Sequence, residues 1–438
     1  MLCIPLKYTF PMFCILTLLI PWASFEQPCS LDTHPFVFGH ERSVATEYRR
    51  VMVAPSKLLE PPLNRVHCAI LHSLPGQSCT KAFLWNLYRN HVSSGKYYSP
   101  LLLLPLVMNW RKVSRKMVLS VAKNYAQSAS FAAWINAITF YLMCMGRRFN
   151  DQFVFIFIPF LPCWIASQLS WLMPPQVLHF FVTGITPAAM ESLMRYSNFG
   201  LVHSPMAQTL MFMISSVIVL HYQQTRKYSG FWFIRPASLP EDNEDWTIVR
   251  QVQQGIRELR SYLGIGLAMD LLNPLMKRNI KLWRPKMTSF LASYIGLFKV
   301  VQLLSFKRLN VNQANALASF ISGSSFALLP NRLTFMCFAI VTAIQVIWSQ
   351  VCNTKDEKDS VLSAVRKIPW ARLLIPCSLA YLVHIFFYHQ RHLNEVARSF
   401  INCTCDNNGQ RLLNLIGLPS VNAILEAVDK TPKTSFWF

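Results

Sequence analysis

Eight apolar segments of about 16–21 residues decide what kind of fold this chain can adopt. A helix that crosses a hydrocarbon core of about 30 Å needs about 20 apolar residues. The segments are Ser128–Gly146, Phe153–Met173, Gln176–Met194, His203–Tyr222, Met287–Phe306, Ala314–Leu329, Leu333–Val351 and Ile368–Phe387. We therefore expect an all-α, polytopic membrane protein with about eight transmembrane helices.

The two halves of the chain resemble each other. Pro174 and Pro330 each separate two apolar segments, at an offset of 330 − 174 = 156 positions. Upstream, Phe131 and Phe290 stand in matching Ser-Phe-X-Ala stretches, at an offset of 290 − 131 = 159. A near-constant offset predicts two repeated four-helix units with turns at Pro174 and Pro330. Chance similarity between apolar helices is the alternative.

Two shorter apolar segments precede the halves and set the predicted boundaries. Tyr97–Trp110 is interrupted by prolines, and Ser261–Met276 by Asp270 and Pro274, so both are predicted as interfacial or re-entrant helices. In the linker, Ile248, Val252, Ile256 and Leu259 share one face of an expected surface helix. The expected regions are an N-terminal region at 1–96, a membrane repeat at 97–222, a polar linker at 223–260, a second repeat at 261–390 and a polar tail at 391–438 that ends in a weakly apolar helix at 412–428.

Charge supports the membrane class and bears on topology. Charged residues make up 14% of the chain, and Lys and Arg outnumber Asp and Glu by 42 to 20. This low charge density argues against nucleic acid as a partner and fits membrane lipids. Basic clusters at 111–123 and 277–286 contain no acidic residue. If only the eight long segments cross, both clusters face one side and the repeats are parallel; if the short segments cross too, the halves become inverted five-helix repeats.

Polar residues inside the apolar segments are the candidate functional residues. Lys299 lies mid-segment, and Asn136 is the one polar interruption of its segment. An ionisable group at this depth must face protein or water, so Lys299 is expected to pair with Glu191 of the other repeat or to line a water-filled groove; a snorkelling lysine is the alternative. Glu191 and Arg195 are spaced to form an i,i+4 pair near the interface.

Small residues at four-residue spacing predict close helix packing. Gly184 is followed by Ala188, Ala318 by Ser322, and Ser319 by Gly323. In lipid, small side chains let helix backbones approach, and this contact replaces the burial of larger side chains.

The sequence contains no strong catalytic, cofactor or metal signature. His67, Cys68, His72 and Cys79 are ligand types for zinc, but their spacing matches no strong site pattern. His389 and His392 are too few for a membrane di-iron site. We therefore predict no catalytic, cofactor-binding or metal-binding residue, no cofactor and no enzymatic activity.

Several short motifs resemble a known family. They are Cys68-Ala69-Ile70-Leu71-His72, Ser78-Cys79, Tyr98-Ser99-Pro100-Leu101, Gln127-Ser128-Ala129-Ser130-Phe131, Glu191-Ser192-Leu193-Met194-Arg195, Phe298-Lys299 and the Ala314–Pro330 segment. In their order and spacing they resemble the transmembrane protein 135 family of peroxisomal and mitochondrial membranes, over residues 68–417. That family is distantly similar to channel-type subunits of mitochondrial protein-import translocases.

The resemblance implies a curved helical sheet with a groove open to lipid, and a non-enzymatic role in lipid handling, fat metabolism and the balance of mitochondrial and peroxisomal fission. Membrane lipids, a second copy of the chain and organelle-division proteins are the implied partners. The first residues depart from the family pattern: Phe10–Trp22 is apolar, and residues 1–24 are a signal peptide that leads to the endoplasmic reticulum, a membrane anchor, or a segment before the true start at Met52. A secondary transporter or channel for a lipid or small solute, working through the groove between the repeats, is the alternative function.

Overall fold

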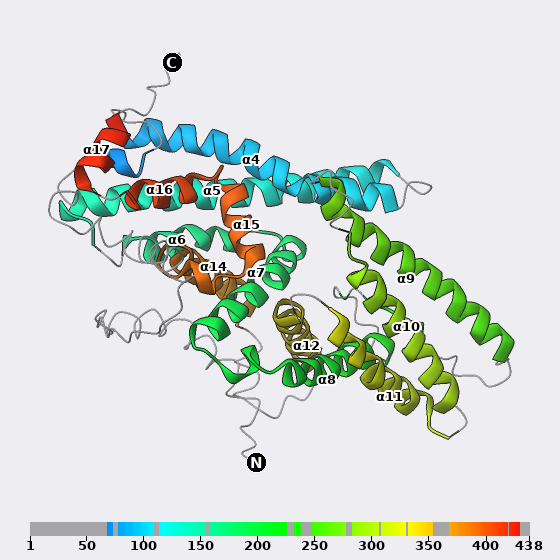
Figure 1. Cartoon of the computed structure of the whole chain (residues 1–438). Helices are drawn as coiled ribbons and strands as arrows, with labels where there is room; N and C mark the ends of the chain where they lie inside the picture. The colour runs from blue at the N-terminus through cyan, green and yellow to red at the C-terminus, as the bar shows by residue number, and fades with distance from the viewer. Residues whose placement is uncertain are drawn as a thin grey trace, which may run out of the picture. The chain divides into compact units, whose positions relative to one another are not determined.

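The computed structural model describes residues 68–72, 78–108, 114–154, 157–225, 232, 234–237, 248–276, 283–305, 308–329, 332–353, 368–418 and 420–429. Throughout these ranges the secondary structure is helical and no strand occurs, so the predicted all-α class is confirmed (Figure 1). Phe10–Trp22, Pro330 and parts of the two basic clusters, at 111–113 and 277–282, lie outside the described residues.

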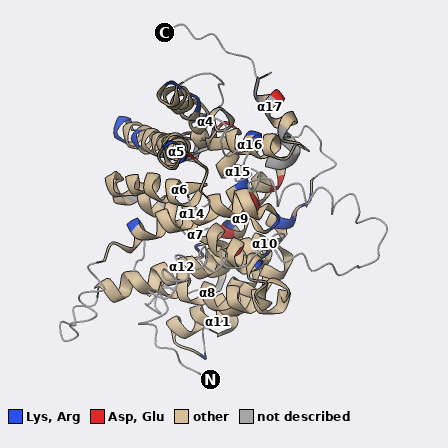
Figure 2. Ribbon diagram, turned by 90° about the vertical axis from the view of Figure 1, so that its left-hand side faces the viewer, with Lys and Arg blue, Asp and Glu red and all other residues tan. Residues whose placement is uncertain are grey.

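In the described ranges, six helices are long and apolar enough to cross a membrane. They are α5 (Arg115–Asn150), α7 (Pro175–Tyr196), α8 (Pro205–Thr225), α10 (Lys286–Ser305), α12 (Arg332–Asn353) and α14 (Trp370–Tyr388). Each covers all or nearly all of one of the predicted spans, which supports a multi-pass membrane protein. The ribbon carries few charged residues between its helix ends (Figure 2).

The other two predicted spans have a different form. Phe153–Met173 contains a short helix α6 (Phe160–Ala166) that continues as a 3-10 helix, η5 (Ser167–Leu172). Ala314–Leu329 contains α11 (Val311–Gly323), continued by η9 (Ser324–Leu328). From the rise per residue, α6 with η5 extends at most about 22 Å and α11 with η9 about 30 Å. The count of eight crossing segments therefore stays a prediction.

The sequence predicted the two shorter apolar segments to be separate short helices, and this prediction is wrong. Tyr97–Trp110 falls largely in α4 (Cys79–Met108), and Ser261–Met276 ends α9 (Ile248–Met276), which also includes the helix expected in the linker. These helices have 30 and 29 residues. Pro100 and Pro105 do not end α4, and Pro274 does not end α9.

The chain divides into two compact units, and their boundaries differ from the predicted ones. Unit 1 contains residues 1–196 and 369–438. In it, α4 packs along α5, α5 packs on α6, and α14 packs against α6, η5 and α7. Helix α14 lies at the centre of unit 1, since 78% of its apolar 18-residue stretch is buried. This explains why α14 is apolar on every face.

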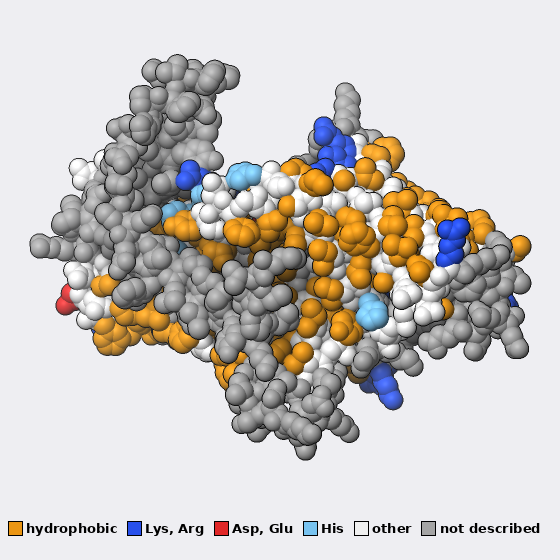
Figure 3. All heavy atoms as spheres, turned by 90° about the horizontal axis from the view of Figure 1, so that it is seen from below, with side chains coloured by type: hydrophobic (Ala, Val, Ile, Leu, Met, Phe, Trp, Pro, Cys, Tyr) orange, Lys and Arg blue, Asp and Glu red, His pale blue; other side chains and the backbone are white. Residues whose placement is uncertain are grey.

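Unit 2 contains residues 197–368. Here α9 packs along α10, α10 packs on α11 and η9, and α8 packs against α11, η9 and α12. In the apolar 18-residue stretch of each helix, only 33% is buried in α8, and 39% is buried in each of α10 and α12. Their outward faces carry large apolar side chains, namely Met206, Leu210, Ile214, Val300, Leu304 and Ile344. A face rich in hydrophobic side chains and poor in charge fits contact with lipid (Figure 3).

The C-terminal tail is part of unit 1, which corrects the expectation of a polar extension. It forms α15 (Glu395–Thr404), α16 (Asn408–Ile416) and α17 (Val421–Asp429), so the helix expected at 412–428 is broken in two. Helix α15 packs on α4 and α7, and Ile401, Leu412 and Ile416 are buried in the core of unit 1. Apolar residues at helical spacing give α15 and α16 one face each to bury.

Candidate functional site

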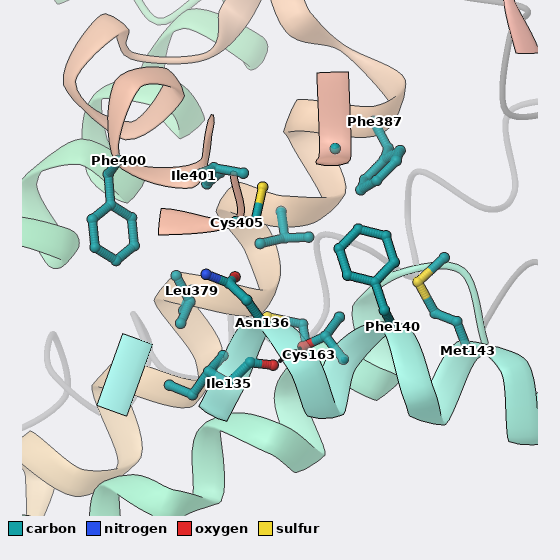
Figure 4. Close-up of a pocket in the computed structure, with 13 residues that line it drawn as sticks. Ile135, Asn136, Phe140, Met143, Cys163, Leu379, Phe387, Phe400, Ile401 and Cys405 are labelled. Atoms are coloured by element: carbon teal, nitrogen blue, oxygen red, sulfur yellow. Dashed lines mark hydrogen bonds between the residues drawn. The ribbon is translucent and has the colours of Figure 1, made fainter. Parts of the chain in front are cut away.

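Unit 1 encloses an apolar cavity between α5, α6, α14, α15 and α16 (Figure 4). Its empty volume is about 450 Å³ when the opening is included. It is lined by Ile135, Asn136, Thr139, Phe140, Met143, Cys163, Leu379, Val383, Phe387, Phe400, Ile401, Cys405 and Gly409. The enclosed part of this space is about 30 Å³, well below the range of small-ligand pockets, and its apolar lining suits the end of a hydrocarbon chain.

Asn136 is the predicted polar residue that the structure places at this cavity. Its side-chain nitrogen donates a hydrogen bond to the Thr404 hydroxyl at 3.0 Å, and Thr404 in turn donates to the Phe400 carbonyl at 2.7 Å. The hydroxyl in the lining itself, on Thr139, donates to the Ile135 carbonyl at 2.7 Å. The donors at the cavity wall are thus engaged within the protein, which leaves a surface of mainly apolar character.

Glu191 and Arg195 form the predicted i,i+4 pair, and this prediction is confirmed. Arg195 donates to one Glu191 oxygen from Nε at 2.9 Å and from Nη2 at 2.7 Å, while the Glu191 side chain is 1% exposed. The second oxygen accepts from the Asn394 amide. The backbone nitrogen of Asn394 also donates to the Ser192 hydroxyl at 3.0 Å. Sequence reasoning did not find Asn394, because 203 positions separate it from Glu191.

The Glu191–Arg195 pair therefore helps to fix the position of α15. It does not serve to bind a transported ion. Asn394 is the N-cap of α15, and its side-chain oxygen accepts from Val396 N at 2.8 Å and Ala397 N at 3.0 Å. A helix cap satisfies backbone donors that would otherwise lack partners. Since α15 contributes Phe400 and Ile401 to the cavity, the buried Glu191 holds one wall of the cavity in place.

Lys299 has a different partner from the one expected. Its ammonium group lies 3.3 Å from a Glu258 carboxylate oxygen on α9 and donates to the Ala237 carbonyl at 3.0 Å. Neither Glu191 nor a water-filled groove is needed to compensate its charge, so the proposed Lys299–Glu191 pair is wrong. Glu258 also accepts from Gln254 at 3.2 Å. The Lys299 stem runs past Gly255, where an added Cβ would lie 3.5 Å from Cγ. Lys299 thus joins α10 to α9 inside unit 2.

Of the glycines predicted to lie at close helix contacts, Gly323 does and Gly184 does not. Ala318 and Ser322 are fully buried, and a Cβ built on Gly323 would lie 2.9 Å from the Met213 Cα on α8. Gly323 is therefore at a close helix contact, as predicted, and its partner helix is α8. Gly184 is not such a contact, because a Cβ there would meet nothing within 4 Å. Four-residue spacing between small residues does not reveal which side of a helix another helix approaches.

Of the two predicted repeat turns, the structure describes one. Pro174 lies between η5 and α7, with an extended residue, Met173, before it. Pro330 lies outside the described residues, although η9 ends at Leu328 and α12 begins at Arg332. The residue before a proline is biased toward extended backbone, which explains why the 3-10 helix ends at that point.

The Cys and His segment before α4 is brought next to α5. Cys68 and Cys79 lie together, and the third thiol beside them is Cys144 on α5. His67 lies outside the described residues, and His72 is not within the same ligand group. The sequence offered no signal for Cys144, because it stands 65 positions after Cys79.

His389, His392 and Tyr196 form a small aromatic group at the end of α14. The ring centroids of Tyr196 and His389 are 4.9 Å apart, and those of the two histidines 6.4 Å. Burial lowers the pKa of His389 from 6.5 to about 4, and the charges of His392 and Arg391 add to this effect. For His392, burial lowers the pKa first, Arg391 and Arg195 lower it further, and a backbone hydrogen bond at Arg195 opposes them.

Acid should therefore destabilise unit 1 through His389. Above pH 6.5 the imidazole is neutral in both the folded and the unfolded chain. As the pH falls from 6.5 to about 4, the unfolded state binds the proton first, so folding stability is lost in this window. We expect the melting temperature in detergent to fall by roughly a few degrees more in the wild type than in His389→Gln. Equal pH profiles for both proteins would contradict this account.

No protein family, curated protein or solved structure matched this chain in the comparisons made. In the described ranges, the one place where three or more His, Cys, Asp or Glu side chains bring their ligand atoms together is the thiol group of Cys68, Cys79 and Cys144.

Proposed function

We propose that this chain is a non-enzymatic integral membrane protein that binds lipid acyl chains and takes part in lipid handling. The apolar cavity of unit 1 carries the proposal, because its lining suits a hydrocarbon chain and its polar side chains are engaged within the protein. The enclosed volume of about 30 Å³ takes only the end of one acyl chain, with the rest of the chain and the headgroup outside.

The resemblance to the transmembrane protein 135 family extends the proposal to location and process. It favours peroxisomal or mitochondrial membranes, and through lipid handling an influence on fat metabolism and on the fission of these organelles. The alternative of transport through Lys299 has less support, because its charge already has the Glu258 carboxylate and the Ala237 carbonyl as partners.

The proposed architecture is a duplicated membrane bundle whose repeats exchange their last helices. Helix α8 follows the helices of unit 1 in the chain yet packs on α11, η9 and α12; α14 follows those of unit 2 yet packs on α6, η5 and α7. A further correspondence joins the long helices. Gly95 on α4 accepts from the Tyr125 hydroxyl of α5 at 2.9 Å, and Gly255 on α9 faces Lys299 of α10, at an offset of 255 − 95 = 160. This offset supports the repeat of 156–159 positions, and mixed α and 3-10 segments stand at the matching place in both units.

The lipid proposal is tested by photo-crosslinking in membranes. A fatty acid with a diazirine in its chain should label α5, α14 or α15 of the wild type at cavity-lining residues. Ile401→Phe adds volume at the lining and should lower this labelling severalfold, because a filled cavity excludes the chain.

Val396→Phe is the matched control, since it lies on the same helix and is 54% exposed. It should label like the wild type. Labelling that is spread over outward faces alone, or that Ile401→Phe leaves unchanged while the protein stays folded, would refute the cavity as a lipid site.

A further inference from the structure

Three cysteines from separate parts of unit 1 meet at one point. Cys68 belongs to the 3-10 helix η2 (Cys68–Ile70), Cys79 is the first residue of α4, and Cys144 lies near the end of α5. Their three sulfur atoms all lie within 4.8 Å of one another. Cys68 and Cys144 are buried, while Cys79 is half-buried.

This spacing is close to that of a three-sulfur metal site. Three thiolates that each lie about 2.3 Å from one ion stand about 3.8–4.0 Å from one another. Small side-chain rotations would bring the three sulfurs to that separation. The Cys68 thiol also donates to the Cys144 carbonyl at 3.7 Å, so η2 is already held against α5.

Positive charge beside the cluster suits bound thiolates. The guanidinium of Arg147 interacts electrostatically with Cys68, and that of Arg148 with Cys79. Three thiolates carry three negative charges, so a site with Zn(II) keeps one and a site with Cu(I) keeps two. Two neighbouring cations offset this remainder, which lowers the electrostatic cost of placing the site in a buried position.

We infer that Cys68, Cys79 and Cys144 bind a thiophilic d10 metal ion, Zn(II) or Cu(I). Sulfur-only donors select such ions and disfavour Mg²⁺ and Ca²⁺, which require oxygen. On binding, the three thiols release their protons to solvent as three metal–sulfur bonds form and the ion loses bound water. The ion would fasten the segment before α4 to the α4–α5 pair, independently of the lipid cavity.

The test uses the full-length protein purified in detergent under anaerobic, reducing conditions. We expect about one Zn or Cu per wild-type chain by mass spectrometry of the metal, and Cys144→Ser should lose it. Cys377→Ser is the matched control, because Cys377 is a buried thiol on α14 of the same unit, and it should keep the metal. Separate titrations with Zn(II) and Cu(I) against competing chelators identify the ion.

A second readout applies even if Cys144→Ser folds poorly. A chelator should lower the melting temperature of the wild type and of Cys377→Ser, and Co(II) added back should give a sulfur-to-metal charge-transfer band. Wild-type protein that binds neither Zn(II) nor Cu(I) more tightly than Cys144→Ser would overturn the inference. A disulfide among the three cysteines of the anaerobically purified protein would overturn it as well.

Discussion

Gly266→Ala should destabilise unit 2 strongly, although alanine is the better helix former. Gly266 lies on α9 where α10 begins, and a Cβ built there would lie 2.6 Å from the Thr288 Cα and 3.0 Å from its nitrogen. These are backbone atoms, so relief requires the helices to move apart. Overpacking of this kind costs roughly 1–3 kcal/mol or more.

Separation would also break the cap of α10. Asp270 on α9 accepts from Met287 N at 3.1 Å, from Thr288 N at 2.8 Å and from the Thr288 hydroxyl at 2.7 Å. Hydrogen bonds to a charged group contribute about 1.5–3 kcal/mol each. We therefore expect a lower melting temperature in detergent and a lower folded yield for Gly266→Ala.

Gly264→Ala is the control, two residues away on the same helix. A Cβ at Gly264 meets nothing within 4 Å. Alanine there should be neutral or stabilising by up to about 1 kcal/mol, because of its helix propensity. If both alanine variants shift the melting temperature in the same direction, the close approach of α9 and α10 at Gly266 is wrong.

Glu258→Gln should lower the free energy of unfolding by about 3 kcal/mol, which is the low end of the range for breaking a buried ion pair. The Lys299 side chain is 9% exposed and would keep only neutral acceptors, the Ala237 carbonyl and the new amide oxygen, whereas the Glu258 side chain is 18% exposed and partly reached by water. Lys299→Met should cost less than Glu258→Gln, because it leaves the more accessible partner unpaired.

The double variant should show the coupling. Lys299→Met with Glu258→Gln should be more stable than Glu258→Gln alone, since no buried charge is then left unpaired. Lys299→Met with Glu191→Gln should instead show additive losses, because Glu191 pairs with Arg195 and Asn394. Melting temperatures that show coupling to Glu191 and none to Glu258 would contradict the observed pairing.

The sequence predicted the helices well because their signals are local. An apolar run of about 20 residues needs no partner to be recognised, and six of the predicted spans lie within α5, α7, α8, α10, α12 and α14 or extend beyond them by no more than two residues. The pair of Glu191 and Arg195 could be predicted for the same reason, since the spacing lies within one helix. The helix boundaries were harder to predict, because α4 and α9 begin well before the apolar stretches that marked them in the sequence.

Contacts between distant segments could not be read from the sequence. Glu258 and Lys299 are 41 positions apart, and nothing in either segment marks the other as its partner. The cavity needs α5 and α15 together, although Asn136 and Thr404 stand 268 positions apart. The packing of α8 within unit 2 and of α14 within unit 1 is of the same kind, because any apolar helix fits the expected pattern and only packing selects its neighbours.

Sidedness of the two basic clusters tests the duplicated bundle most directly. If α6 with η5 crosses the membrane as α5, α7 and α8 do, four crossings separate the clusters at 111–123 and 277–286, which then face the same compartment. If that segment does not cross, three crossings put them on opposite sides. The measurement is labelling of Ser114→Cys and Asn279→Cys by a membrane-impermeant maleimide in intact and permeabilised organelles, in a background where the exposed Cys352 and Cys403 are serine. Parallel four-span repeats predict labelling from the same side, and labelling from opposite sides would contradict them.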